Sequence, residues 1–188
     1  MKLSMVAEGT PFKKDTHMKD LDYSRTKLKW NGWGWEGKSF HLGDEDREGH
    51  FWTFVQENLN ATNLPSTPSM KWEDVALPKS KVTAAVHKKL IGILDEDRVK
   101  TDAYERIFHA VGKSYRDLLR IRQGVLPGAP DAVLYPKTTE EVVELVKLAS
   151  AKKFAIIPYG GGSSVVGGVE AVAGTDHKGV WTLDLSQM

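Results

Sequence analysis

Ala155-Ile-Ile-Pro-Tyr-Gly-Gly-Gly-Ser-Ser-Val-Val-Gly-Gly-Val169 is the stretch from which the fold can be predicted. A short apolar run that ends at Pro158 and then meets three glycines predicts a strand that feeds an open backbone loop. Successive residues without a Cβ let their amide groups turn toward one concavity, which suits an anion. Ser163 and Ser164 add hydroxyl donors at its rim, so the stretch favours phosphate binding.

The loop does not match the two common nucleotide-binding fingerprints. No Lys-Ser or Lys-Thr follows the glycines, which excludes a Walker loop. Counted from Gly160, the third glycine of the Rossmann pattern would fall at Val165, and Gly167 and Gly168 would break the helix that this pattern requires. The loop is therefore predicted to bind its anion through backbone amides alone. A glycine-rich turn without a ligand is the alternative interpretation.

Composition limits the function classes. Of the chain's residues, 40% are apolar and 27% charged, as is usual for a globular protein. A length of 188 residues predicts one domain with an appendage. A net charge of +1 gives no footprint for nucleic acid. There is no cysteine, so neither disulfides nor thiolate metal sites are expected, and no other metal site is predicted. The sequence shows no secretory signal and no apolar run near the ~20 residues of a membrane span.

The first 126 residues are expected to contain a leader and a helical region. Residues 1–29 are polar and basic, and they predict a loosely ordered leader, with a basic contact arm as the alternative. Residues 30–126 are the predicted helical amino-terminal region. At its start lies Lys29-Trp-Asn-Gly-Trp-Gly-Trp35, a segment expected to dock on the main body. Trp30 and Trp33 are expected to be largely buried against residues 127–188, because a Gly-Trp segment has no core of its own. The alternative is a wall for a hydrophobic ligand.

Three helical patterns follow, and a predicted linker at Asn63–Pro68 separates the first from the second. Phe51, Phe54, Val55 and Leu59 share one helical face. A second helix is expected after Ser80, with apolar residues inward up to Ile93. The longest is predicted as one helix from a cap at Asp102 to a stop at Gly124. His109 lies beside its apolar stripe and is expected to be solvated or packed rather than to bind a ligand.

Residues 127–188 read as α/β. A turn cluster at 127–131 marks the predicted domain boundary, and strands are expected at 132–135, 155–158 and 180–185. A helix capped by Thr138 joins the first two, with Val142, Leu145, Val146 and Ala149 on its buried face. The glycines then follow the carboxyl end of a strand, where open α/β sheets bind ligands. So few strands leave uncovered edges, and the sequence looks cut off. The predicted fold class is α+β: a helical region followed by an incomplete α/β subdomain.

Several motifs together resemble one known family. They include Asp131-Ala-Val-Leu-Tyr-Pro136 and the Thr138-Thr-Glu-Glu-Val-Val143 helix, which resemble the vanillyl-alcohol-oxidase-type (PCMH-type) FAD-binding family. Within that family the chain is similar to the amino-terminal part of the alkyldihydroxyacetonephosphate synthases. The specific marks, which cover nearly the whole chain from residue 25, are Lys29-Trp-Asn-Gly-Trp-Gly34, Asp97-Arg-Val99, Arg122-Gln-Gly124, Pro158-Tyr-Gly-Gly-Gly-Ser-Ser164 and Leu183-Asp-Leu-Ser-Gln-Met188.

The resemblance implies a non-covalent FAD. Its pyrophosphate would lie on Pro158, Tyr159, Gly160, Gly161, Gly162, Ser163 and Ser164. Several members attach the flavin through a histidine in this loop, and here no histidine is present. A side chain introduced at Gly162 is expected to abolish flavin retention and leave the fold largely intact. The catalytic residues of the family lie beyond Met188, so no residue here is assigned a catalytic role.

The implied activity is that of a flavoenzyme in ether-lipid synthesis. Such enzymes exchange the acyl chain of acyl-dihydroxyacetone phosphate for a fatty alcohol. The alternatives are an FAD-linked 2-hydroxy-acid oxidoreductase of the same fold and a truncated, non-catalytic fragment. The resemblance also leaves room for a homodimer and for peripheral membrane contact. These 188 residues alone are expected neither to hold FAD tightly nor to turn over substrate.

The expected location is cytoplasmic. Eukaryotic members of the family carry an amino-terminal peroxisomal signal. Lys2-Leu3 begins that pattern, but Gly9-Thr10 stand where it should close.

Overall fold

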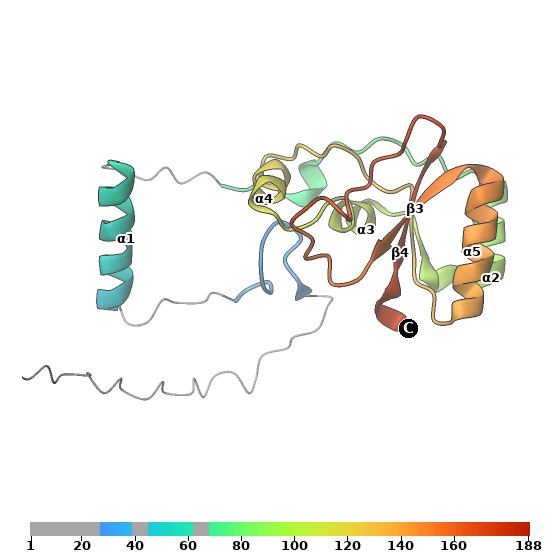
Figure 1. Ribbon diagram of the computed structural model, residues 1–188, viewed down its shortest axis with the longest axis horizontal. Helices are drawn as coiled ribbons and strands as arrows, with labels where there is room; N and C mark the ends of the chain where they lie inside the picture. The colour runs from blue at the N-terminus through green and yellow to red at the C-terminus, as the bar shows by residue number, and fades with distance from the viewer. Residues whose placement is uncertain (1–26, 39–44, 62–67) are drawn as a thin grey trace, which may run out of the picture.

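A four-stranded sheet in the order β1-β2-β4-β3 forms the centre of the computed structural model, which describes residues 27–38, 45–61 and 68–188 (Figure 1). The three longer strands run parallel to one another, while β1 pairs antiparallel with β2. Helices lie on both sides of this mixed sheet, which confirms the predicted α+β class. The strands are β1 (Val99–Lys100), β2 (Ala132–Leu134), β3 (Phe154–Tyr159) and β4 (Gly179–Asp184).

β4 is the central strand and is buried on both faces. It pairs in register with both neighbours, so that Trp181 lies between Ala132 and Ile156. All six of its residues are buried, as expected for a parallel strand covered on both sides. The alternating pattern over residues 180–185 predicted the strand, but Leu185 lies outside it, in the short 3-10 helix η5 (Leu185–Gln187).

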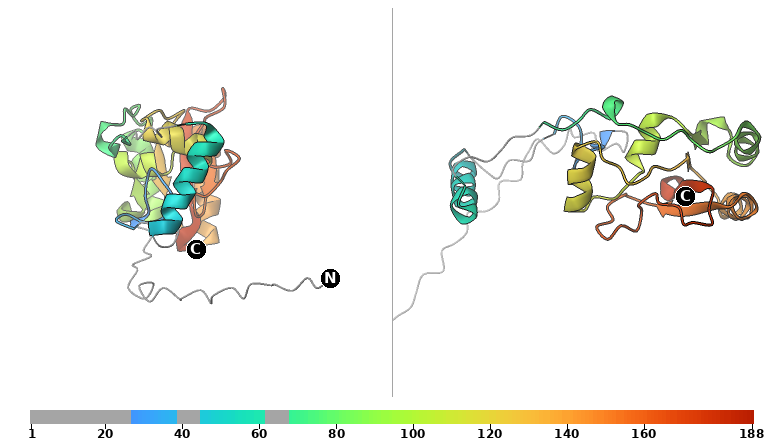
Figure 2. Two further views of the ribbon diagram at one scale, coloured as in Figure 1. Left: turned by 90° about the vertical axis from the view of Figure 1, so that its left-hand side faces the viewer. Right: turned by 90° about the horizontal axis from the view of Figure 1, so that it is seen from above.

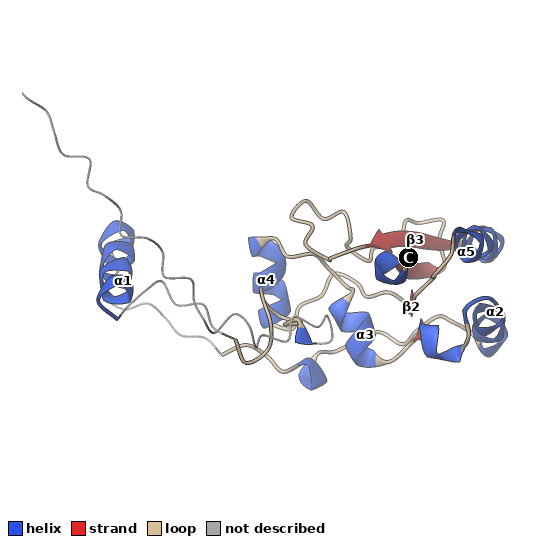
Figure 3. Cartoon of the chain, turned by 90° about the horizontal axis from the view of Figure 1, so that it is seen from below, coloured by secondary structure: helices blue, strands red, loops and turns tan. Residues whose placement is uncertain are grey.

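Two helices cover one side of the sheet. α2 (Ala84–Leu94) and α5 (Thr139–Lys152) lie side by side there (Figures 1 and 3). Each begins at a threonine cap, and α5 ends at Lys153 in the left-handed conformation. Between these helices and the sheet lies a core of Val86, Leu90, Leu94, Val99, Ala132, Leu134, Leu145, Ala149, Phe154, Trp181 and Leu183. Val146, predicted to face inward, is about half exposed.

The predicted long helix over residues 102–124 is wrong. The structure has two helices, α3 (Ala103–Phe108) and α4 (Tyr115–Arg122), separated by residues 109–114. Asp102 caps α3 as expected. Ser114 starts a new helix through a full capping box with Asp117, each side chain accepting from the other residue's amide. The second half of the predicted stripe does not point into a core, because Tyr115 is 79% exposed.

The tryptophan-rich stretch, residues 27–38, folds back on itself and is called the Trp segment below. Leu28 and Trp35 form an isolated antiparallel bridge, and Lys29 donates its amide hydrogen to the carbonyl of Gly34 at 2.9 Å. Trp30 is buried, as predicted, among Val75, Ile107, Ala110, Val111 and Ile121. These buried neighbours all belong to the helical region, so the prediction that Trp30 packs against residues 127–188 is wrong. Trp33 is 56% exposed, so its predicted burial is wrong.

The helix α1 (Glu45–Leu59) lies apart from the rest of the described chain (Figures 1 and 2). The apolar face that predicted it exists, but its side chains are exposed, with Phe54 at 61% and Leu59 at 64%. None of the helices in the described ranges is long and apolar enough to cross a membrane. Most of the predicted leader and linker, at residues 1–26 and 62–67, lies outside the described residues.

Candidate functional site

The glycine loop, residues 160–164, leaves β3 at the carboxyl ends of the parallel strands. The amides of Gly161, Gly162 and Ser163 have no hydrogen-bond partner among the described residues. A Cβ added to Gly160 or Gly161 would meet nothing within 4 Å. The loop therefore offers unpaired N–H donors beside open space, and this donor set fits an anion such as a pyrophosphate.

Gly162 has a different role from its two neighbours. Its φ is +67°, in the left-handed region, and a Cβ there would stand 2.1 Å from the hydroxyl of Tyr159. A side chain at Gly162 would therefore disturb the packing of Tyr159. The expectation that such a change spares the fold is wrong, and a test of ligand binding belongs at Gly161.

One short segment, residues 108–113, holds both ends of the glycine loop. Before the loop, the Tyr159 hydroxyl donates to the carbonyl of Phe108 at 3.2 Å. After it, the amide of Lys113 donates to the carbonyl of Ser164 at 2.8 Å. Gly112 permits this contact, because a Cβ there would lie 2.1 Å from the same carbonyl oxygen. Residues 108–113, where the chain breaks between α3 and α4, thus hold the glycine loop in place.

The chain beyond the loop is fastened to the same helices. The amide of Ala171 donates to the carbonyl of Ala110 at 2.8 Å, and Glu170 forms an ion pair with Arg120 at 3.2 Å. The Ser164 hydroxyl accepts from the amide of Gly168 at 3.1 Å, and it keeps its own hydrogen for another partner. These contacts explain how a long loop between β3 and β4 keeps a defined course.

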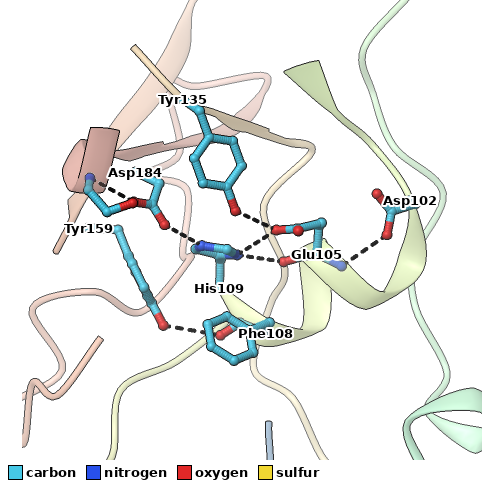
Figure 4. A network of polar contacts seen from close by, with 8 residues as sticks. Asp102, Glu105, Phe108, His109, Tyr135, Tyr159 and Asp184 are labelled. Carbon is cyan, nitrogen blue, oxygen red and sulfur yellow. Dashed lines mark hydrogen bonds and ion pairs between the residues drawn. The ribbon is translucent and has the colours of Figure 1, made fainter. Parts of the chain in front are cut away.

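A buried polar cluster lies at the carboxyl ends of the strands, next to the loop (Figure 4). His109 is 1% exposed, and its Nε2 lies 2.9 Å from a carboxylate oxygen of Asp184, the last residue of β4. Its Nδ1 lies 2.8 Å from the carbonyl oxygen of Glu105, whose carboxylate accepts from the Tyr135 hydroxyl at 2.7 Å. The imidazole also packs on Tyr159, with 4.4 Å between ring centroids. His109 is packed, as predicted, and carries specific partners.

The proton positions in this cluster follow from the acceptors. A carbonyl oxygen can only accept, so Nδ1 of His109 carries a hydrogen. Nε2 then lies 2.9 Å from the Asp184 carboxyl group, within hydrogen-bond distance. Beside the cluster lies a cleft of about 280 Å³ lined by Asp97, Lys100, Tyr104, Glu105, Phe108, His109, Tyr135, Ser186 and Gln187.

Two other motifs on which the family resemblance rests stabilise the fold. In the Asp97-Arg-Val99 motif, the buried Arg98 lies 2.8 Å from Glu141 at the start of α5. Hydrogen bonds from the Arg98 guanidinium lower the pKa of Glu141 to about 2. In the Asp131 motif, the buried carboxylate accepts from the amides of Lys81 at 2.7 Å and Val180 at 2.9 Å. These residues hold the sheet rather than line the loop.

The predicted site residues fall into two groups. The structure brings Gly160, Gly161, Gly162, Ser163 and Ser164 together in the open loop. Pro158 and Tyr159 belong to β3, and the Tyr159 side chain is only 1% exposed, so it supports the loop from inside. Sequence reasoning missed Asp184 and Tyr135. The available signal was that both stand where predicted strands end at the ligand-binding edge.

A family model for an FAD binding domain matches residues 130–188, the part of the chain that contains β2, β3, β4 and the glycine loop. This match and the similar synthases support FAD as the cofactor. The resemblance to alkyldihydroxyacetonephosphate synthase is confirmed by the synthase of Trypanosoma brucei brucei, which is 31% identical over 178 residues. That match covers 86% of this chain and 29% of the relative, so the chain spans under a third of its length.

The fold comparison agrees with the sequence comparison. A solved structure of alkyldihydroxyacetonephosphate synthase superposes with a TM-score of 0.71 at 31% identity, covering 86% of this chain and 33% of that one. The mitochondrial D-lactate dehydrogenase [cytochrome] of Arabidopsis thaliana is 36% identical over 107 residues, which is 55% of this chain and 17% of the relative. The longer matches thus extend well beyond the family model toward the amino terminus.

Proposed function

We propose that this chain supplies the FAD-pyrophosphate-binding part of an alkyldihydroxyacetonephosphate synthase-like flavoenzyme. The observation that carries the proposal is the glycine loop, where the amides of Gly161, Gly162 and Ser163 are unpaired among the described residues and the space beside Gly160 and Gly161 is open. Such amides would hold the pyrophosphate non-covalently. FAD supplies the reactive ring of the flavin, and the chain's part is to bind and orient the cofactor.

The substrates belong to the same proposal. They are acyl-dihydroxyacetone phosphate and a long-chain fatty alcohol, and the support is the similarity to synthases over 86% of the chain. We also propose a membrane or subunit contact through the exposed apolar face of α1, which carries Phe51, Phe54 and Leu59. A cytoplasmic location remains a proposal that rests on the residues at Gly9-Thr10.

A second candidate is an FAD-linked 2-hydroxy-acid oxidoreductase of the same fold. The similarity to D-lactate dehydrogenase favours it, but over 55% of the chain only. The synthase matches cover 86% of the chain. The Lys29-Trp-Asn-Gly-Trp-Gly34 motif is also one of the stretches on which the sequence resemblance to the synthases rests. We therefore rank the synthase first.

Two assays on the whole protein that contains these residues, purified from its natural source, test the proposal. Its visible absorbance spectrum should show bound flavin, and acid precipitation should release that flavin, because the attachment is non-covalent. The protein should then incorporate labelled fatty alcohol into a product when given acyl-dihydroxyacetone phosphate. Reduction of an electron acceptor by D-lactate without alkyl exchange would favour the oxidoreductase, and absence of flavin would contradict both candidates.

A further inference from the structure

Lys113 touches the Trp segment on one side and the glycine loop on the other. Its ammonium donates to the carbonyl of Trp30 at 2.9 Å and to that of Lys29 at 3.2 Å. Its backbone amide donates to the carbonyl of Ser164 at 2.8 Å. One residue thus joins a motif that the proposed function does not use to the loop that it does use.

Apolar contacts also connect the Trp segment with residues 108–113. Trp30 belongs to the same buried cluster as Ala110 and Val111, which come just before Gly112 and Lys113 in the chain. The Lys113 ammonium also lies 5.7 Å from the ring centroid of Phe108, whose carbonyl holds Tyr159. Neither the Trp segment nor the glycine loop has a core of its own, so both depend on residues 108–113 for their position.

The charged groups near Lys113 have other partners, so its ammonium forms hydrogen bonds with the two carbonyls. Asp117 on α4 and Glu170 beyond the loop are both ion-paired with Arg120, and the Lys29 ammonium donates to the carbonyl of Lys38. Burial lowers the pKa of Lys113 to about 8. A neutral amine still has two hydrogens to donate, so the contact to both carbonyls does not depend on the charge.

We propose that Lys113 is a positioning residue that couples the Trp segment to the glycine loop, so that docking of the segment and binding of a pyrophosphate stabilise each other. The identity of the ligand rests on the proposed function, whereas the coupling itself does not. By linkage, an anion bound at the loop must stabilise the docked Trp segment by the same factor as the docked segment strengthens anion binding.

Hydrogen–deuterium exchange of the apo protein tests the coupling without any ligand. In Lys113→Met, which keeps the chain length and loses the donors, exchange should rise about tenfold in peptides covering residues 28–35 and also 164–171. Lys113→Arg restores donors and should exchange within about twofold of the unaltered protein. Lys147→Met, which removes an exposed lysine paired with Glu144 on α5, is the matched control and should change neither peptide.

The second arm keeps the test decisive if Lys113→Met loses its fold. FAD added to the unaltered protein should slow exchange in residues 28–35, although no residue there belongs to the loop. Faster exchange at 28–35 with unchanged exchange at 164–171 in a folded Lys113→Met would overturn the coupling. Protection of the loop by FAD without any change at 28–35 would do the same. If FAD protects nothing, the proposed function fails, and the apo comparison still decides the coupling.

Discussion

Gly112 lies against the carbonyl oxygen of Ser164 so closely that a Cβ on Gly112 would stand 2.1 Å from that oxygen. The two residues are far apart in sequence, and this approach fixes where the chain leaves the glycine loop. Gly112→Ala should therefore destabilise the protein by about 1–3 kcal/mol, because backbone atoms cannot move aside as a flexible side chain can. Urea unfolding measures the change.

Gly92 provides the matched control for that substitution. It lies inside α2, where a Cβ would meet nothing within 4 Å. Gly92→Ala should stabilise the protein by about 0.5–1 kcal/mol, because alanine loses less conformational entropy in a helix than glycine does. Equal effects of the two substitutions would show that the close approach at Gly112 has no energetic weight.

Asp131 should be one of the most sensitive positions of the sheet. Its buried carboxylate accepts the amides of Lys81 and Val180, and one of its oxygens fills the place that a side chain would take at Gly179. Asp131→Ala leaves two amides without their acceptor and should lower the free energy of unfolding by about 2–4 kcal/mol. Asp131→Asn keeps one acceptor and should lose less, as thermal or urea unfolding can show.

The contact between His109 and Asp184 should show strong thermodynamic coupling. His109→Phe keeps the ring packing on Tyr159 and leaves a fully buried carboxylate without its ring partner, so a loss of about 3 kcal/mol is expected. Asp184→Asn in the same background should recover part of that loss. A double-mutant cycle from unfolding curves gives the coupling, and strictly additive effects would contradict the direct interaction.

Stability should fall in acid through Glu141. The Arg98 guanidinium lowers the pKa of Glu141 to about 2, whereas an unfolded glutamate has a pKa of about 4.3. The unfolded state therefore binds the proton more readily, and the contribution of this pair is fully present above about pH 5 and lost as the pH falls toward 2. Partial exposure limits it to about 2 kcal/mol.

Glu141→Gln isolates that contribution. The glutamine variant should be less stable than the unaltered protein at neutral pH, and the difference should shrink as the pH falls below about 4. Unfolding by urea at several pH values measures it. A difference that stays constant with pH would mean that the pair contributes through packing and not through charge.

The sequence predicts those parts of the fold that depend on local patterns. The caps at Asp102 and Thr138, the strands around residues 132 and 156 and the loop at their edge all follow from spacing over a few residues. The break at Gly112 could not be predicted from the helical pattern, because its cause is the carbonyl of Ser164, which lies remote in sequence. Ser114 and Asp117 did carry the signal for a new helix start.

In the candidate site, too, local features could be predicted from the sequence and contacts between remote segments could not. The open glycines were visible in the sequence, but the different roles of Gly161 and Gly162 depend on where the Tyr159 ring lies. His109 stands beside an apolar stripe, and nothing local shows that Asp184 faces it across the fold. Contacts between remote segments therefore account for most of what the sequence alone did not predict.

The central claim, that the glycine loop binds the FAD pyrophosphate through its amides, is tested most directly by amide NMR of the ¹⁵N-labelled chain during titration with FAD. Weak binding suffices for this measurement. We expect the largest shifts at Gly161, Gly162 and Ser163, and their loss in Gly161→Val, whose side chain enters open space in the apo protein and leaves its remaining spectrum unchanged. Shifts confined to other parts of the chain, or the same loop shifts in Gly161→Val, would contradict the claim.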